Sequence, residues 1–112
     1  MRIIFCGTSS FAIPSLERLV SREHTVVLCV TQPDRPRGRW LRLEPSPVKQ
    51  AAERRRLPLA QPERLTRAMC EPLEADLGVV MAYGRLIGRE LLTLPMHGMI
   101  GVHPSLLPAY RG

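Results

Sequence analysis

The hydrophobic positions of the chain fall into short runs, and four of these runs predict strands that are buried on both faces. They lack the polar alternation of a half-exposed strand, which is typical of parallel sheets with both faces covered. A weaker apolar run around a proline predicts an edge strand at residues 57–59. The four buried strands are predicted at residues 2–6, 25–30, 77–82 and 99–103.

Apolar residues at helical spacing predict helices between these strands. The first helix is expected to start near Phe11, with Ser10 as its cap and Pro14 tolerated in its first turn. A second helix is expected after Ser46-Pro47, a cap followed by a first-turn proline. Further helices are predicted within residues 61–73 and at 90–92. The alternation predicts an α/β fold: an open, mostly parallel, Rossmann-like sheet with helices on both faces.

Between the second strand and the second helix lies a proline-rich stretch, residues 31–47, which we predict to be irregular. Its four prolines and one glycine are typical of a loop rather than of regular structure. It is too long for a simple connection, and long loops in compact domains are usually functional or disordered. We therefore expect this stretch to carry part of the function.

The positive charge of the chain is concentrated in and just after this loop. The 112 residues carry a formal net charge of +6. Residues 31–56 contain eight cations and three acids, which accounts for nearly all of the excess. One interpretation is a polyanionic partner. The other is compositional, because Lys49 is the only lysine and arginine serves as the general surface cation. Trp40 in this loop either stacks on a base or packs on the sheet, and packing is slightly favoured.

Composition narrows the class of protein. An apolar fraction of 45% and a charged fraction of 23% are those of an ordinary globular domain. No apolar run is long enough to span a bilayer, and we expect a cytoplasmic protein without a membrane partner. Cys6, Cys29 and Cys70 form no C-x-x-C pair, which fits a reducing compartment and no metal site. The first glycine turn contains only Gly7, which disfavours a dinucleotide or nucleoside-triphosphate site.

His103 is the candidate catalytic group. It stands at the end of the last predicted strand and is followed at once by a proline-bounded loop. Open α/β sheets place catalytic groups beyond the carboxyl ends of their strands. The alternative is a strand-end histidine capped by a turn, and spacing alone leaves both interpretations open.

Several short motifs follow one another along the chain. They are F-C-G-T (5–8), T-Q-P-D-R-P (31–36), G-R (38–39), P-S-P-V-K (45–49), A-Y-G (82–84), V-H-P-S-L-L-P (102–108) and Y-R-G (110–112). In this order they resemble the methionyl-tRNA formyltransferases over essentially the whole chain. The loop at residues 105–108 is shared with the wider group that uses 10-formyltetrahydrofolate, including purine and sugar formyltransferases. The stretch at residues 31–49 points to the tRNA-dependent branch.

This resemblance implies transfer of the formyl group of 10-formyltetrahydrofolate, a co-substrate, to the amino group of methionyl initiator tRNA, without a metal. It implies that His103 is catalytic and that Gly101 occupies the position of the family's catalytic asparagine. The implied folate-binding residues are Tyr83, Gly84, Ser105, Leu106, Leu107 and Pro108. The implied tRNA-binding residues are Arg35, Arg37, Arg39 and Arg42.

The chemistry of formyl transfer agrees with these roles. The amine attacks a carbonyl carbon, an oxyanion develops, and a histidine can donate a hydrogen bond to it. Gly101 has no side chain to donate a second one. The resemblance implies that residues 1–112 are the N-terminal portion of the catalytic domain, and that the remainder and a C-terminal β-barrel domain are absent. We therefore expect an inactive chain, monomeric in its full-length form. The alternatives are a non-catalytic fragment with a basic nucleic-acid-binding surface, or a formyltransferase for a small amine such as an amino sugar or purine precursor.

Overall fold

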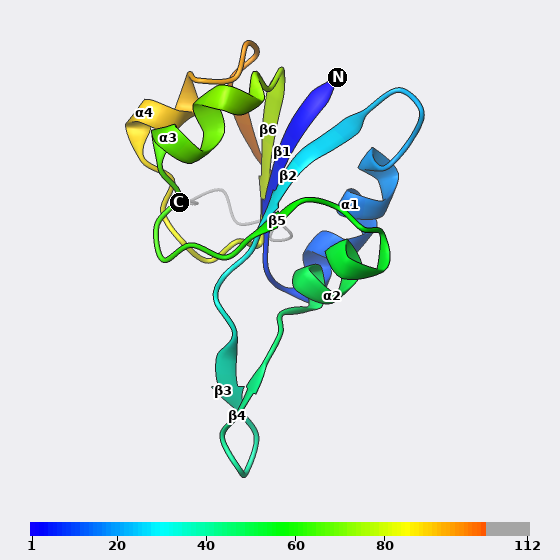
Figure 1. The fold of residues 1–112 in the computed structure, drawn as a ribbon, viewed down its shortest axis with the longest axis vertical. Helices are drawn as coiled ribbons and strands as arrows, with labels where there is room; N and C mark the ends of the chain where they lie inside the picture. Colours follow the sequence, from blue (N-terminus) through cyan, green and yellow to red (C-terminus); the bar gives the residue numbers. More distant parts are fainter. Residues whose placement is uncertain (103–112) are drawn as a thin grey trace.

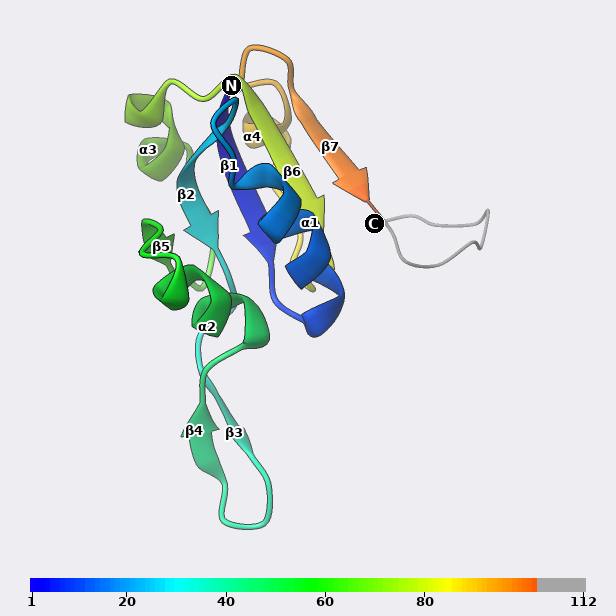
Figure 2. The same ribbon diagram turned by 90° about the vertical axis from the view of Figure 1, so that its right-hand side faces the viewer.

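The computed structural model describes residues 1–102 and has a five-stranded parallel sheet at its centre. The strand order is β5-β2-β1-β6-β7, so the first strand lies in the middle (Figure 2). The strands are β1 (Arg2–Gly7), β2 (Thr25–Val30), β5 (Leu59–Ala60), β6 (Leu77–Met81) and β7 (Met99–Val102). The predicted open parallel sheet is confirmed, including the edge position of the short strand β5.

Helices cover both faces of this sheet (Figure 1). The helices are α1 (Ile13–Leu19), α2 (Pro47–Arg54), α3 (Arg67–Cys70) and α4 (Arg89–Leu92). Successive side chains of a strand point to opposite faces. Ile3 and Phe5 of β1 accordingly join one buried cluster with α1 and α2, whereas Ile4 and Cys6 join a second cluster with α3 and α4. Burial on both sides is what the unbroken apolar runs predict.

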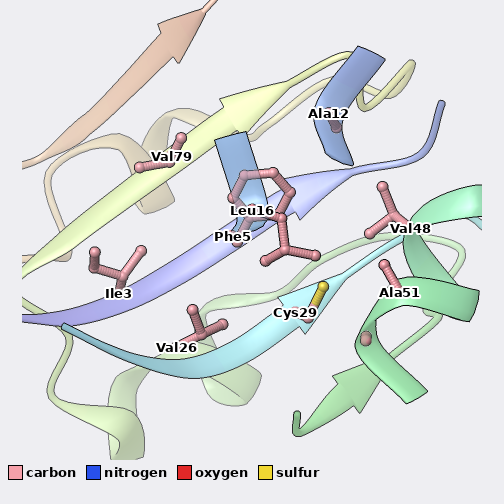
Figure 3. Packing of buried hydrophobic residues seen from close by; sticks show 10 residues of the cluster. Ile3, Phe5, Ala12, Leu16, Val26, Cys29, Val48, Ala51 and Val79 are labelled. Carbon is pink, nitrogen blue, oxygen red and sulfur yellow. The ribbon is translucent and has the colours of Figure 1, made fainter. Parts of the chain in front are cut away.

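The first cluster is built around Phe5, which is fully buried (Figure 3). Leu16 of α1 and Val48 and Ala51 of α2 contribute to the same cluster. In β2, Val26 belongs to this cluster but Val27 belongs to the other one. A register shift between Ile3 and Ile4 places Leu28 rather than Val27 opposite Ile4, so β2 contains one extra residue relative to β1. β1 thus contributes side chains to both clusters, one on each face of the sheet.

The helix starts partly differ from the prediction. Ser46 caps α2 as predicted, and its Oγ accepts a hydrogen bond from the Lys49 backbone N–H at 3.0 Å. Ser10 is not the first cap; Ser9 accepts from the Phe11 N–H, and a 3₁₀ turn, η1 (Ser10–Ala12), precedes α1. The predicted helix at 61–73 begins only at α3 and continues as the 3₁₀ turn η2 (Glu71–Leu73). Pro72 lies in η2, and it cannot donate the hydrogen bond that a longer α-helix needs.

The prediction that residues 31–47 are irregular is wrong. They contain an antiparallel hairpin, β3 (Arg35–Arg37) and β4 (Arg42–Glu44), which extends away from the sheet (Figure 1). Pro36 is accommodated because both strands of a two-stranded ribbon are edges, where a missing N–H faces solvent. Gly38, with φ of 75°, opens the turn. Trp40 lies in this turn and is 80% exposed, so the expected packing on the sheet is also wrong.

Within residues 1–102, no helix has the length and apolar character needed to cross a membrane.

Candidate functional site

The candidate site lies where the carboxyl ends of β1, β2, β6 and β7 meet at one edge of the sheet, the usual place for a site in an open α/β fold. Gly101 is at this edge: it lies in β7, pairs with Val80 and is exposed. The predicted catalytic and folate-loop residues that come after β7 lie outside the described residues. They are His103, Ser105, Leu106, Leu107 and Pro108.

The loops that follow β1, β2 and β6 are joined by hydrogen bonds to one carbonyl group. The Tyr83 carbonyl oxygen accepts from Thr8 Oγ1 at 2.7 Å and from Gln32 Nε2 at 2.7 Å. The carbonyl of Ala82 accepts from the Thr8 N–H at 2.9 Å. Both polar side chains therefore contribute to the position of the loop that starts at Tyr83. Thr8 and Gln32 were not predicted as site residues from the sequence.

A pocket of about 740 Å³ opens beside the loop at residues 83–88. Its size is that of a small-molecule site. Tyr83 and Gly84, which were predicted as ligand-binding residues, line it, and so does Arg35. The remaining lining residues were missed by the sequence analysis: Glu63, Arg64, Leu65, Arg85, Leu86, Ile87 and Gly88. Among them, residues 85–88 have one signal in the sequence, which is that they come soon after a buried strand. The lining combines apolar surface with three arginines and one glutamate.

Two residues that line the pocket each contain a buried donor with no hydrogen-bond partner among the described residues. They are the hydroxyl of Tyr83 and Nε of Arg85. Tyr83 is 2% exposed, and burial raises its pKa to about 12, so the hydroxyl stays protonated at neutral pH. Another nitrogen of Arg85, Nη1, donates to the Glu63 carbonyl oxygen at 2.8 Å. Both atoms are buried, and the ring of Tyr83 belongs to the second apolar cluster, so neither donor is accessible to a ligand in the pocket.

The hairpin carries exposed cations together with exposed apolar side chains. Arg39 and Arg42 are exposed, and neither takes part in an ion pair within residues 1–102. Leu41 and Leu43 are 71% and 69% exposed, next to Trp40. Arg35 at the base differs from them, because its guanidinium donates to the side-chain oxygen of Gln32. The predicted tRNA-binding arginines therefore divide into a group at the tip and one residue at the pocket. The backbone of Arg37 lies in β3.

The described residues show no metal site and no activated thiol. No group of three or more His, Cys, Asp or Glu side chains in residues 1–102 is arranged to hold a metal ion. All three cysteines are free and buried. Burial raises the pKa of Cys29 to about 12 and that of Cys6 further, so both remain thiols.

Comparisons with known proteins identify the family of the chain. A sequence profile described as formyl transferase matches residues 1–112. The chain is 47% identical to the methionyl-tRNA formyltransferase of Acidobacterium capsulatum and 51% identical to that of Chloroflexus aurantiacus, in each case over its whole length. It spans 38% and 37% of those two proteins.

Solved structures show the same fold. The phosphoribosylglycinamide formyltransferase of Bacillus halodurans matches with a TM-score of 0.69 and 19% identity, over 100% of this chain and 60% of that one. The glycinamide ribonucleotide transformylase 1 of Geobacillus kaustophilus matches with a TM-score of 0.63 and 25% identity, over 99% of this chain and 62% of that one.

Proposed function

The chain belongs to the formyl transferase family, and from this premise we propose that it forms the N-terminal portion of the catalytic domain of a methionyl-tRNA formyltransferase. This enzyme moves the formyl group of 10-formyltetrahydrofolate to the amino group of methionine on initiator tRNA. The relatives of 47% and 51% identity that carry this name support the assignment. A tRNA substrate would locate the reaction in the cytoplasm.

The pocket beside residues 83–88 is the proposed site of the folate. A reduced folate joins a flat heterocycle, rich in hydrogen-bonding groups, to a negatively charged glutamate. Leu65, Leu86 and Ile87 offer apolar surface to the ring. Arg85 pairs with Glu63 and Arg64 pairs with Glu90, whereas Arg35 forms no ion pair within residues 1–102 and can attract an anionic group. When bound, the folate supplies an electrophilic formyl carbon.

The hairpin is the proposed site of the tRNA. Exposed arginines add little to folding stability but much to affinity for phosphates. Arg39 and Arg42 are exposed and form no ion pair in the described part of the chain. They can therefore contact phosphates without breaking an ion pair within the described residues. Trp40 offers a flat surface on which a base can stack. A small neutral amine would have no use for such a surface.

The proposed catalytic groups are His103 and the residue at position 101. A histidine donates a hydrogen bond or proton to the oxygen of the acyl-transfer intermediate. The family's asparagine would donate a second one, but Gly101 has no side chain. We propose that this chain turns over slowly for that reason.

One observation carries the proposal: a mixed apolar and cationic pocket lies at the same edge of the sheet as the base of a basic hairpin, and Arg35 belongs to both. The test uses the complete polypeptide that carries residues 1–112, supplied with 10-formyltetrahydrofolate. Methionyl initiator tRNA and glycinamide ribonucleotide are compared as acceptors. Binding of the stable reduced folate 5-formyltetrahydrofolate is measured by calorimetry, so that binding is tested even where turnover is slow.

We expect folate binding, and formyl transfer to the tRNA at a rate that the substitution Gly101→Asn increases. Preferential transfer to glycinamide ribonucleotide would support the small-amine alternative instead. Binding of tRNA without folate binding, and without turnover in either variant, would support the non-catalytic alternative.

A further inference from the structure

Gln32 is a buried glutamine whose backbone and side-chain polar groups form hydrogen bonds with four other residues. It is 8% exposed and lies two residues after the end of β2. Its Nε2 donates to the Tyr83 carbonyl oxygen at 2.7 Å, and its Oε1 accepts from the Arg35 guanidinium. Its backbone N–H donates to Thr8 Oγ1 at 3.4 Å, and its carbonyl accepts from Gln61 Nε2 at 3.2 Å.

The two side-chain bonds of Gln32 lead to two different functional elements. Tyr83 begins the loop that lines the pocket, whereas Arg35 is the first residue of β3 in the hairpin. One amide group therefore links the start of the pocket loop to the start of the hairpin. Its donor serves one element and its acceptor serves the other, so each connection can be removed separately.

Gly84 makes room for this amide. Its φ of 81° lies in the region that favours glycine, and a Cβ atom there would lie 2.4 Å from Gln32 Nε2. Any other residue at position 84 would have to displace the amide. The pocket loop is thus shaped around the side chain of Gln32.

We propose that Gln32 is a positioning residue that couples the pocket to the hairpin, so that a folate in the pocket and a tRNA on the hairpin change each other's affinity. This inference rests on the proposed function for the identity of the two ligands. A ligand that fixes the loop at Tyr83 also fixes the amide of Gln32, and through it Arg35. Coupling between two binding sites is reciprocal, so it can be measured from either ligand.

The structural link is tested without ligands, by hydrogen exchange of the complete polypeptide. Gln32→Leu should speed exchange both in the hairpin, residues 35–44, and in the pocket loop, residues 83–88. Gln32→Glu keeps and strengthens the acceptor for Arg35 but loses the donor to Tyr83, so it should speed exchange in the pocket loop and not in the hairpin. Arg35→Met should affect the hairpin alone. Gln50→Leu is the matched control, since Gln50 is an exposed glutamine on α2.

Thermal melts identify any variant that fails to fold. If Gln32→Leu fails, Gln32→Glu and Arg35→Met still decide the question, because each removes only one of the two bonds. Exchange that rises equally in both segments in all three variants would overturn the separate roles of donor and acceptor. Unchanged exchange in both segments of Gln32→Leu would overturn the link itself.

The functional consequence is tested with 5-formyltetrahydrofolate and unacylated initiator tRNA as probes. The Kd for the folate should differ by about fivefold or more with and without saturating tRNA, the usual lower range for coupled sites. In Gln32→Leu this ratio should fall to about one while both probes still bind, whereas Gln50→Leu should keep the wild-type ratio. If Gln32 only stabilised the fold, Gln32→Leu would weaken binding of both probes without changing the ratio of the folate Kd values with and without tRNA.

The outcomes separate this inference from the proposed function. If the wild-type polypeptide binds both probes with a ratio of about one, or if Gln32→Leu keeps the wild-type ratio, the coupling is wrong and the proposed function stands. If the wild-type polypeptide binds neither probe, the proposed function fails and the coupling fails with it.

Discussion

Lys49 on α2 forms an ion pair with Asp34 at the base of the hairpin, with 3.0 Å between Nζ and Oδ2. The other carboxylate oxygen of Asp34 accepts from Gln61 Nε2 at 2.7 Å. The hydrogen bond from Gln61, and then that from Lys49, hold the pKa of the Asp34 carboxyl below its usual range. One carboxylate thus fixes the base of the hairpin to α2 and to the segment that follows β5.

We expect this arrangement to lose stability in acid. A carboxyl whose pKa is lowered by folding contributes stability above its unfolded pKa of about 3.9, and this is lost as the pH falls through the folded pKa. Asp34→Asn should therefore flatten the dependence of the unfolding midpoint on pH below about pH 5. Titration of the Asp34 carboxyl carbon by NMR checks the cause: Gln61→Leu and Lys49→Met should each raise the pKa. A wild-type pKa at or above the unfolded value would contradict the interpretation.

Tyr83→Phe should improve folding and leave folate binding unchanged. The Tyr83 hydroxyl is buried without a partner in residues 1–102, and leaving such a group unsatisfied costs about 1–3 kcal/mol. Removing it should leave the free energy of unfolding unchanged or raise it by up to that amount. Because the hydroxyl is buried in the apolar cluster and not accessible from the pocket, the same change should leave the Kd for 5-formyltetrahydrofolate unchanged. Chemical denaturation and calorimetry measure the two effects, and a loss of stability would indicate a hidden partner.

The parallel sheet could be predicted from the sequence because it depends on local apolar runs. Residues 25–30 and 77–82 are apolar at nearly every position, and such runs fit only a strand covered on both faces. The start of α2 was predictable for the same reason, since Ser46 and Pro47 act on their immediate neighbours. In these elements, the local sequence and the tertiary environment require the same conformation.

The hairpin and the pocket could not be predicted because they depend on contacts between distant segments. Prolines normally argue against a strand, and only the isolation of a two-stranded ribbon allows Pro36 to lie in β3. The pocket combines Leu65, which follows β5, with residues that follow β6. Gln32 resembled an ordinary loop residue, because its partners Thr8 and Tyr83 are far from it in sequence.

Arg39→Ala should weaken tRNA binding without affecting folding. Arg39 is exposed, so the free energy of unfolding should change by no more than about 0.5 kcal/mol. If Arg39 neutralises one phosphate, the slope of log affinity against log salt should become shallower by about one unit. Arg22→Ala is the matched control, because Arg22 is an exposed arginine between α1 and β2. A shifted unfolding midpoint with an unchanged slope would show that Arg39 has an internal role instead.

Trp40→Ala should also weaken tRNA binding, but through stacking rather than charge. Loss of one base–aromatic stack costs about 1–3 kcal/mol in single-strand binders. The salt slope should stay the same because no cation is removed, and Trp40→Phe should restore part of the affinity. Met96→Ala, at a position that is also largely exposed (77%) but lies away from the hairpin, is the control. An unchanged affinity in Trp40→Ala would exclude stacking.

Gly101→Asn should increase turnover, and its comparison with Gly101→Ala should identify the reason. Gly101 is exposed in β7, and glycine within a strand is unfavourable by roughly 0.5–1 kcal/mol relative to alanine. Both substitutions should therefore be neutral or mildly stabilising. Only asparagine adds an amide donor for the developing oxyanion, and loss of one such donor typically lowers turnover about 10²–10³-fold.

We accordingly expect Gly101→Asn to raise kcat by up to about 10²–10³-fold in the complete polypeptide. Gly101→Ala should leave kcat unchanged, and the Kd for 5-formyltetrahydrofolate should be the same in both variants. Single-turnover formylation of methionyl initiator tRNA measures the chemical step without interference from product release. If alanine raised kcat as much as asparagine, the gain would come from a stiffer strand and not from a donor at position 101. If neither substitution had an effect, position 101 would not contribute to the oxyanion site.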